Sequence, residues 1–150
     1  MSAALDPSRV YLDSNVFIYA VEGQTEISEA LRALFDLFRR RRGFAVTSEL
    51  TIAEVLAKAT PTQQRDYIDL IVESDLFDLC PVTRGILVAT ASYRQAFGMV
   101  KLADAIHVMT AVHTSCNTML SADRRLKAPE GLRLIDSTRE NVSRLIHELT

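Results

Sequence analysis

Residues 9–20 decide the fold, and they read RVYLDSNVFIYA. The apolar residues at positions 10–12 have the character of a short buried strand. Asp13, Ser14 and Asn15 follow at once, and then the apolar run resumes as a short helical turn near residues 16–20. A carboxylate placed directly after a buried strand needs a reason, which is either a helix cap or a functional group.

Outside this stretch, apolar segments with strand character alternate with segments of helical periodicity. We expect further strands at residues 44–47, 77–80, 118–121 and 133–135. We expect further helices at residues 26–40, 49–59, 61–74, 83–97, 101–114 and 139–149. Glycines at positions 43 and 98 end two of these helices. The alternation predicts an α/β fold in a single domain, residues 1–150, with a mostly parallel five-stranded sheet between helices on both faces.

The composition is that of a globular protein, with 48% hydrophobic residues. No apolar run approaches the roughly 20 residues needed to cross a bilayer, so no membrane association is expected. The start, MSAALDPSR, lacks the apolar region of a secretory signal, and residues 1–8 have no evident role. Cys80 and Cys116 are too few for a disulfide framework. We therefore expect a cytoplasmic protein with reduced, mostly buried thiols.

The net charge of -2 argues against a protein that coats nucleic acid through bulk charge. Any contact with nucleic acid must come from local basic patches. The densest patch is the run RRRR at residues 39–42, which fits either a helix C-terminus or phosphate contacts. Arg124 and Arg125 directly follow an acid, Asp123, and they fit either solvated surface residues or RNA contacts.

Four acids lie near the carboxyl ends of predicted strands or on the helices beside them: Asp13, Glu54, Asp104 and Asp123. Each has an ordinary structural explanation. Asp13 and Asp123 could cap turns, Asp104 could complement a helix N-terminus, and Glu54 could pair with Lys58.

Taken together, the four acids favour another interpretation. The carboxyl ends of parallel strands meet at one edge of a sheet, where such folds bind ligands. Apolar residues flank Glu54 and Asp104, and crowded, partly buried carboxylates repel each other. A divalent cation removes this conflict. Hard oxygen ligands suit Mg²⁺ or Mn²⁺ better than Zn²⁺.

The segments YLDSNVFIY, TSELTIAEVL, KLADAIHVMTA and MLSADRRL, in this order and spacing, resemble those of PIN-domain ribonucleases. The likeness is greatest to the VapC-type toxins of type II toxin–antitoxin systems. It implies a three-layer sandwich and a metal-dependent endoribonuclease that hydrolyses RNA phosphodiester bonds. It also carries Asp13, Glu54, Asp104 and Asp123 onto the family's acidic quartet, as catalytic residues and as ligands of Mg²⁺ or Mn²⁺.

Two polar residues beside the quartet also match the family. Asn15 and Ser121 are expected to support the pocket through hydrogen bonds rather than to bind metal. Ser121, Ala122 and Asp123 stand where the family often has Thr-Asn-Asp, so one polar side chain is missing at that edge. Asp13 and Asp104 are the expected closest ligands. His107 lies three residues after Asp104 and could approach the same helix face, but a structural or surface role is favoured for a lone histidine.

Other function classes fit less well. A phosphotransfer receiver domain needs paired acids after its first strand, and a haloacid-dehalogenase phosphatase needs an acid where this chain has Asn15. A PIN nuclease of RNA processing that is not a toxin, or a catalytically silent binding module with the same fold, remains an alternative.

The resemblance also implies an antitoxin protein as partner, beside the RNA substrate. Two apolar stripes support a protein partner: one in residues 27–38, and one formed by Tyr67, Ile68, Leu70 and Ile71. If one sheet face cannot cover both, the remainder suits an antitoxin helix or a homodimer contact. Burial of both stripes in the core is the alternative.

Overall fold

The central strand of the sheet is β1 (Val10–Leu12), the apolar segment from which the sequence argument began. The fold was obtained as a computed structural model, which describes residues 9–23 and 25–150. The other strands are β2 (Ala45–Ser48), β3 (Phe77–Cys80), β4 (Thr118–Ser121) and β5 (Arg133–Asp136). They form one five-stranded sheet in the order β3-β2-β1-β4-β5, and every neighbouring pair is parallel. The predicted parallel α/β sheet is therefore confirmed.

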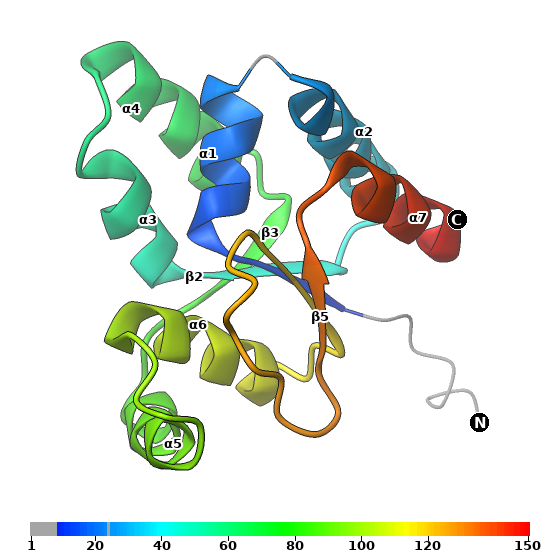
Figure 1. Ribbon diagram of the computed structural model, residues 1–150. Helices are drawn as coiled ribbons and strands as arrows, with labels where there is room; N and C mark the ends of the chain where they lie inside the picture. The colour runs from blue at the N-terminus through cyan, green and yellow to red at the C-terminus, as the bar shows by residue number, and fades with distance from the viewer. Residues whose placement is uncertain (1–8, 24) are drawn as a thin grey trace.

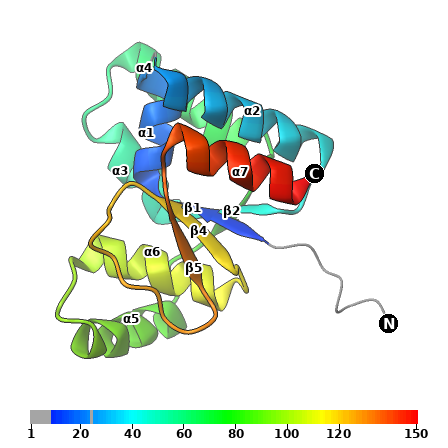
Figure 2. The same cartoon turned by 45° about the vertical axis from the view of Figure 1, so that its right-hand side comes forward.

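Helices cover both faces of this sheet, as Figures 1 and 2 show. One face carries α1 (Ser14–Glu22), α2 (Glu26–Arg40), α3 (Glu49–Leu56), α4 (Pro61–Ile68) and α7 (Arg139–Leu149). The other face carries α5 (Arg84–Ala96) and α6 (Leu102–His113). This is the expected three-layer arrangement. Within the described helices, none is long and apolar enough to span a membrane.

Most predicted boundaries lie within a residue or two of the observed ones, and the exceptions have local causes. The short turn expected at residues 16–20 is a nine-residue helix, α1, because Asp13 caps it two residues earlier than the apolar run suggests. The helix expected at residues 61–74 is α4 followed by a wider π-helical turn, η2 (Asp69–Glu73). α2 ends at Arg40 with Arg41 as its C-cap, and Gly43 lies in the turn just past the helix, with a φ of 95° that favours glycine.

Alternation along β1 sends its side chains to two different cores. Val10 and Leu12 enter the larger core, beneath α1, α2 and α7. Tyr11 enters the smaller core, between the sheet and the pair α5 and α6. The expectation that two apolar stripes leave an uncovered remainder is wrong for their largest members, because the larger core buries them. These residues are Leu31, Leu34, Phe35, Phe38, Tyr67 and Ile71.

Exposed apolar side chains gather instead on and beside α5 and α6. Val88 is 65% exposed, Leu102 is 53% exposed and Leu87 is 47% exposed. The smaller, two-helix layer therefore presents apolar surface to solvent, whereas the helices of the larger layer bury their stripes against one another. Both cysteines are free thiols, as expected, with Cys116 buried and Cys80 half-buried.

Candidate active site

The strand order reverses direction between β1 and β4, and Asp13 follows β1 at this point. Parallel sheets bind ligands beyond the carboxyl ends of the strands at such a reversal. Asp13 is 2% exposed, and its Oδ1 accepts a hydrogen bond of 2.6 Å from the backbone N–H of Ser14, which caps α1. Its Oδ2 accepts a hydrogen bond of 2.9 Å from the Ser121 hydroxyl at the end of β4. Asp13 is thus both a helix cap and a buried carboxylate that joins the two strands.

Glu54 reaches the same region from α3, the helix that Ser48 caps directly after β2. Its expected alternative partner, Lys58, does not pair with it. Instead, Glu54 Oε1 lies 2.5 Å from His107 Nε2 on α6. Burial raises the pKa of Glu54, but the hydrogen bond and charge of His107 outweigh this and hold the pKa below its ordinary value. Glu54 is therefore a carboxylate at neutral pH.

Asp104 stands in the first turn of α6, where a carboxylate complements the helix N-terminus. Within the described part of the chain, its carboxylate forms no hydrogen bond or ion pair. Partial burial raises the pKa of Asp104, and the nearby charges of Asp13, Asp123 and Glu54 raise it further. Four acids from distant parts of the sequence therefore share one electrostatic environment, and Asp104 experiences their mutual repulsion.

Asp123 follows β4 and is the acid whose charge is best compensated. Its Oδ1 accepts hydrogen bonds from the backbone N–H of Arg125 at 2.9 Å and from the Arg125 guanidinium at 3.1 Å. These bonds hold the pKa of Asp123 below its ordinary value. The Ser121 hydroxyl accepts a hydrogen bond from the Asp123 backbone N–H at 3.1 Å, so Ser121 bridges Asp13 and Asp123. Ser121 thus makes hydrogen bonds of the expected kind.

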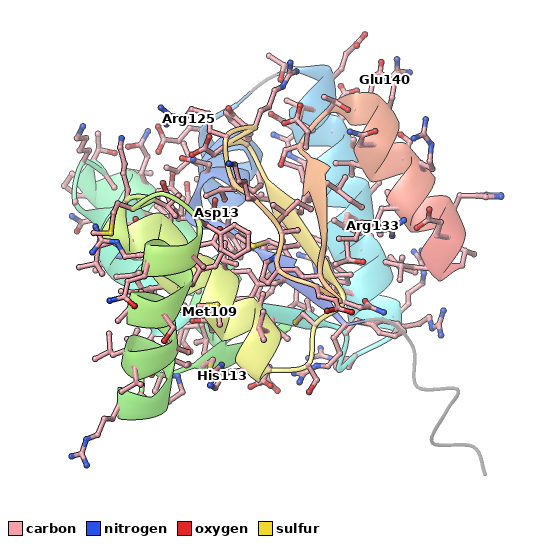
Figure 3. All side chains as sticks on the ribbon, turned by 60° about the horizontal axis from the view of Figure 1, so that its bottom comes forward. Asp13, Met109, His113, Arg125, Arg133 and Glu140 are labelled. Carbon is pink, nitrogen blue, oxygen red and sulfur yellow. The ribbon has the colours of Figure 1, made fainter. Side chains whose placement is uncertain are left out.

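Glu54, Asp104 and Asp123 line an open, polar cleft of about 490 Å³ at the carboxyl edge of the sheet, whereas Asp13 is buried and is not among its lining residues. The lining residues of the cleft are Asn15, Tyr19, Glu54, Lys101, Ala103, Asp104, Ala122, Asp123 and Arg125. Figure 3 shows Asp13 and Arg125 toward one end of the molecule and His113, the last residue of α6, toward the other. Among the described residues that line the cleft, Lys101 and Arg125 are the basic ones.

Some sequence expectations need correction. Asn15 lines the cleft and is exposed, but its side chain makes no hydrogen bond to an acid within the described residues; Ser14 makes that contact instead. Arg124 pairs with Asp136 at 2.7 Å. Residues 39–42 directly precede β2 and therefore lie at the amino edge of the sheet, away from the acids. The phosphate contact considered for that run is wrong for this site, and the helix C-terminus interpretation holds.

His107 is the residue that sequence reasoning undervalued. It is fully buried, and its Nε2 also lies 3.7 Å from Asp13 Oδ1. Its Nδ1 lies 2.6 Å from the hydroxyl of Tyr11 on β1. The only sequence signal was its position three residues after Asp104, because its other neighbours are 53 and 96 residues away along the chain.

The PIN domain family model matches residues 10–132, most of the described chain and all four acids. The chain belongs to the PIN domain family. PIN domains are generally nucleases, and they typically use divalent metals. No curated protein sequence matches this PIN domain closely enough to add a more specific function.

Solved structures similar to this PIN domain include the following three. A chain of VapBC2 from Rickettsia felis, in complex with a promoter DNA fragment, has a TM-score of 0.66 at 13% identity; 85% of this chain and 97% of that chain are covered. A chain of a toxin–antitoxin complex from Klebsiella pneumoniae has a TM-score of 0.64 at 20% identity; 87% of this chain and 98% of that chain are covered. A chain of FitAcB from Neisseria gonorrhoeae has a TM-score of 0.58 at 18% identity; 85% of this chain and 97% of that chain are covered. At these identities the likeness shows the fold.

Proposed function

We propose that this PIN domain is a metal-dependent endoribonuclease whose acids, Asp13, Glu54, Asp104 and Asp123, bind a divalent cation and act on RNA phosphodiester bonds. The observation that carries the proposal is the convergence of these acids at the reversal of strand order, with Asp104 left uncompensated. A buried anion without a partner is costly, and a bound cation would offset that cost.

The donor set fits Mg²⁺ or Mn²⁺, since it consists of carboxylate oxygens at an open, hydrated cleft. In the described residues, no three His, Cys, Asp or Glu side chains are yet close enough to ligate one ion together. Asp13 and Asp104 are the proposed direct ligands, because hydrogen bonds to basic side chains already hold the other two acids. Asp123 is held by Arg125, and Glu54 by His107.

A bound divalent cation would supply charge stabilisation at the phosphate and an activated water. The protein's own groups would orient the reactants. Glu54 Oε1 is occupied by His107, which leaves Oε2 to accept a hydrogen bond from a water in the cleft. Asp13 is held on both oxygens by serine and backbone donors, so its geometry is fixed before any ligand arrives.

Basic residues at the border of the cleft are proposed to contact the RNA backbone. Arg125 lines the cleft beside Asp123, and Lys101 lines it from the start of α6. Arg124, adjacent in sequence, pairs with Asp136 and remains largely exposed. Such side chains supply salt-dependent phosphate contacts without reading base sequence.

Cleavage of end-labelled RNA by the purified chain, with Mg²⁺ or Mn²⁺ and with EDTA, tests this proposal. Asp13→Asn and Asp104→Asn should each lower the cleavage rate by about 100-fold or more, because each removes a ligand charge with little change of shape. Asp36→Asn is the matched control, since Asp36 is exposed on α2 and, within the described residues, pairs only with Arg39. Cleavage that persists in EDTA or in Asp13→Asn contradicts the proposal.

We propose further that the chain is the VapC-like toxin of a toxin–antitoxin pair, held inactive by an antitoxin and forming a homodimer. The support is the likeness to a chain of a toxin–antitoxin complex and to chains of VapBC2 and FitAcB, together with exposed apolar side chains on α5 and α6. Co-expression with any small neighbouring gene, followed by co-purification and growth measurement, tests this role. No co-purifying partner and no growth arrest when the chain is expressed alone would leave a PIN nuclease of RNA processing. Loss of cleavage with intact metal binding would favour a silent binding module.

A further inference from the structure

A chain of hydrogen bonds runs from the sheet to the acidic cleft through three side chains. Tyr11 on β1 and His107 on α6 are both fully buried, and the Tyr11 hydroxyl lies 2.6 Å from His107 Nδ1. His107 Nε2 lies 2.5 Å from Glu54 Oε1 on α3, at the wall of the cleft. The chain therefore connects three elements that are separate in sequence.

The chemistry of Glu54 fixes the direction of the hydrogen bond at its end of the chain. Glu54 is a carboxylate and can only accept, so His107 Nε2 carries the hydrogen and donates it. Burial and the charge of Asp13 raise the pKa of Tyr11 well above its ordinary value, so Tyr11 is a neutral phenol. The Tyr11 hydroxyl and His107 Nδ1 share the second hydrogen bond, in which either atom can be the donor. His107 therefore donates to Glu54 whichever atom donates in the second bond.

The surroundings of His107 indicate that filling space in the core does not explain a histidine at this position. The neighbouring core positions on α6 are Ala105, Val108 and Ala111, all buried and all apolar. Apolar side chains at both positions 11 and 107 would suit that core and would avoid the cost of burying two polar side chains. The cost is offset only if the hydrogen bonds are made, and they end on Glu54.

We propose that His107, held in orientation by Tyr11, is a positioning residue that fixes the Glu54 carboxylate in the cleft so that Oε2 faces the reacting groups. The catalytic part of this inference rests on the proposed nuclease function. Its metal-binding part does not require RNA cleavage, because misplacing a carboxylate in the acid cluster also changes affinity for a cation.

A pair of variants at one position separates positioning from simple space filling. His107→Leu fills the core position with an apolar side chain but removes the N–H that donates to Glu54. His107→Gln returns an amide N–H that can reach Glu54. We expect His107→Leu to weaken Mn²⁺ binding and to lower kcat by about 10- to 100-fold with little change in KM for RNA. His107→Gln should recover most of that loss.

Tyr11→Phe removes only the hydroxyl, so it tests the same chain of hydrogen bonds even if the His107 variants misfold. It should lower kcat and Mn²⁺ affinity by a smaller factor, about 3- to 10-fold. Tyr93→Phe is its matched control, because Tyr93 is a buried tyrosine of the same core whose hydroxyl bonds the Lys127 carbonyl instead. His113→Ala is the control for histidine loss, since His113 is exposed at the far end of α6.

A double-mutant cycle tests whether His107 acts through Glu54. In a Glu54→Gln background, His107→Leu should have almost no further effect on kcat, because its target is already removed. Single-turnover cleavage and Mn²⁺ calorimetry supply the two readouts, at a temperature where every variant is folded.

Equal effects of His107→Leu and His107→Gln, or additive effects of His107→Leu and Glu54→Gln, would overturn the inference. If the wild-type chain binds Mn²⁺ but cuts no RNA, the nuclease proposal fails, while the calorimetric comparison still decides the role of His107. Absence of Mn²⁺ binding by the wild-type chain overturns both.

Discussion

The aromatic side chains that are buried on the two faces of the sheet make different contacts. Under α1 and α2, Phe17, Phe35, Phe38 and Phe77 pack ring against ring, with centroids between 5.0 and 6.3 Å apart. On the α5 and α6 face, Tyr11 lies edge-on to a histidine, His107, at 5.7 Å, and the pair continues into the acidic cleft.

The difference separates stability from function in the molecule. The phenylalanine cluster carries no polar atom, so its contribution is burial and aromatic contact. The Tyr11–His107 pair buries polar groups that a stable core does not need, and it ends at a cleft that concentrates negative charge. Substitutions on the first face should change folding, whereas those on the second should change ligand binding.

The largest expected effect is on the phenylalanine face. Phe35→Ala should lower the free energy of unfolding by about 3–5 kcal/mol, because it removes a fully enclosed ring and leaves a cavity. Chemical denaturation measures this, with Val88→Ala on the exposed face of α5 as a control that should change by less than about 0.5 kcal/mol. A loss below about 1 kcal/mol for Phe35→Ala would contradict the assigned role of this face.

Ser121→Ala should have the next largest effect, because Ser121 bridges Asp13 and Asp123. Removing its hydroxyl leaves one oxygen of a buried carboxylate without its donor, which should cost about 1–3 kcal/mol in chemical denaturation. Ser92→Ala is the control, since Ser92 is exposed on α5. A Ser121→Ala protein as stable as wild type would show that Asp13 does not depend on this bond.

Asp104→Asn should stabilise the protein when a chelator removes divalent cations. Relief of repulsion between like charges is worth on the order of 0.5 kcal/mol. The sign follows from the raised pKa of Asp104: its carboxylate is disfavoured in the folded state, so the wild-type penalty is present near neutral pH.

Measuring unfolding against pH checks this assignment. The advantage of Asp104→Asn should shrink as pH falls and should vanish below the ordinary aspartate pKa of 3.8, where both states bind the proton. A variant that is less stable than wild type at pH 7 in chelator would contradict a crowded acid site.

The smallest effect on stability is expected for Arg125→Ala, because the Arg125–Asp123 pair is at the surface. Its effect on RNA binding should be larger. The slope of log affinity against log salt concentration should fall by about 1 if Arg125 contacts a phosphate. Arg39→Ala, at the amino edge of the sheet, should leave the slope unchanged, and an equal change in both would remove Arg125 from the RNA interface.

Much of the fold was predictable because its signals are local. Strand residues at 77–80 and 118–121 were predicted with the observed limits, since short apolar runs bounded by turns carry that information. The four acids were also predictable as a group, because parallel strands bring their carboxyl ends to one edge. Burial of the apolar stripe on α2 was not predictable from the sequence, because it depends on α7. That helix comes from the far end of the chain and packs against α2.

The partners within the site could not be predicted for the same reason. The spacing also allowed a pair between Glu54 and Lys58, four residues away, but Glu54 pairs with His107 from another helix. Asn15 has the right spacing to support Asp13, yet Ser14 caps α1 and takes that place. Spacing along the chain indicates which residues share an edge of the sheet, but side-chain direction decides which of them touch.

Thermal unfolding against Mg²⁺ concentration, at constant ionic strength, tests the central claim that the acid cleft binds a divalent cation. For the wild-type chain, Mg²⁺ at 100 times its Kd should stabilise by about 2.7 kcal/mol. In a domain of this size that stabilisation raises Tm by roughly 5–10 °C. Asp104→Asn should lose most of this rise. A wild-type Tm that does not change with Mg²⁺, or an equal rise in Asp104→Asn, would contradict the claim.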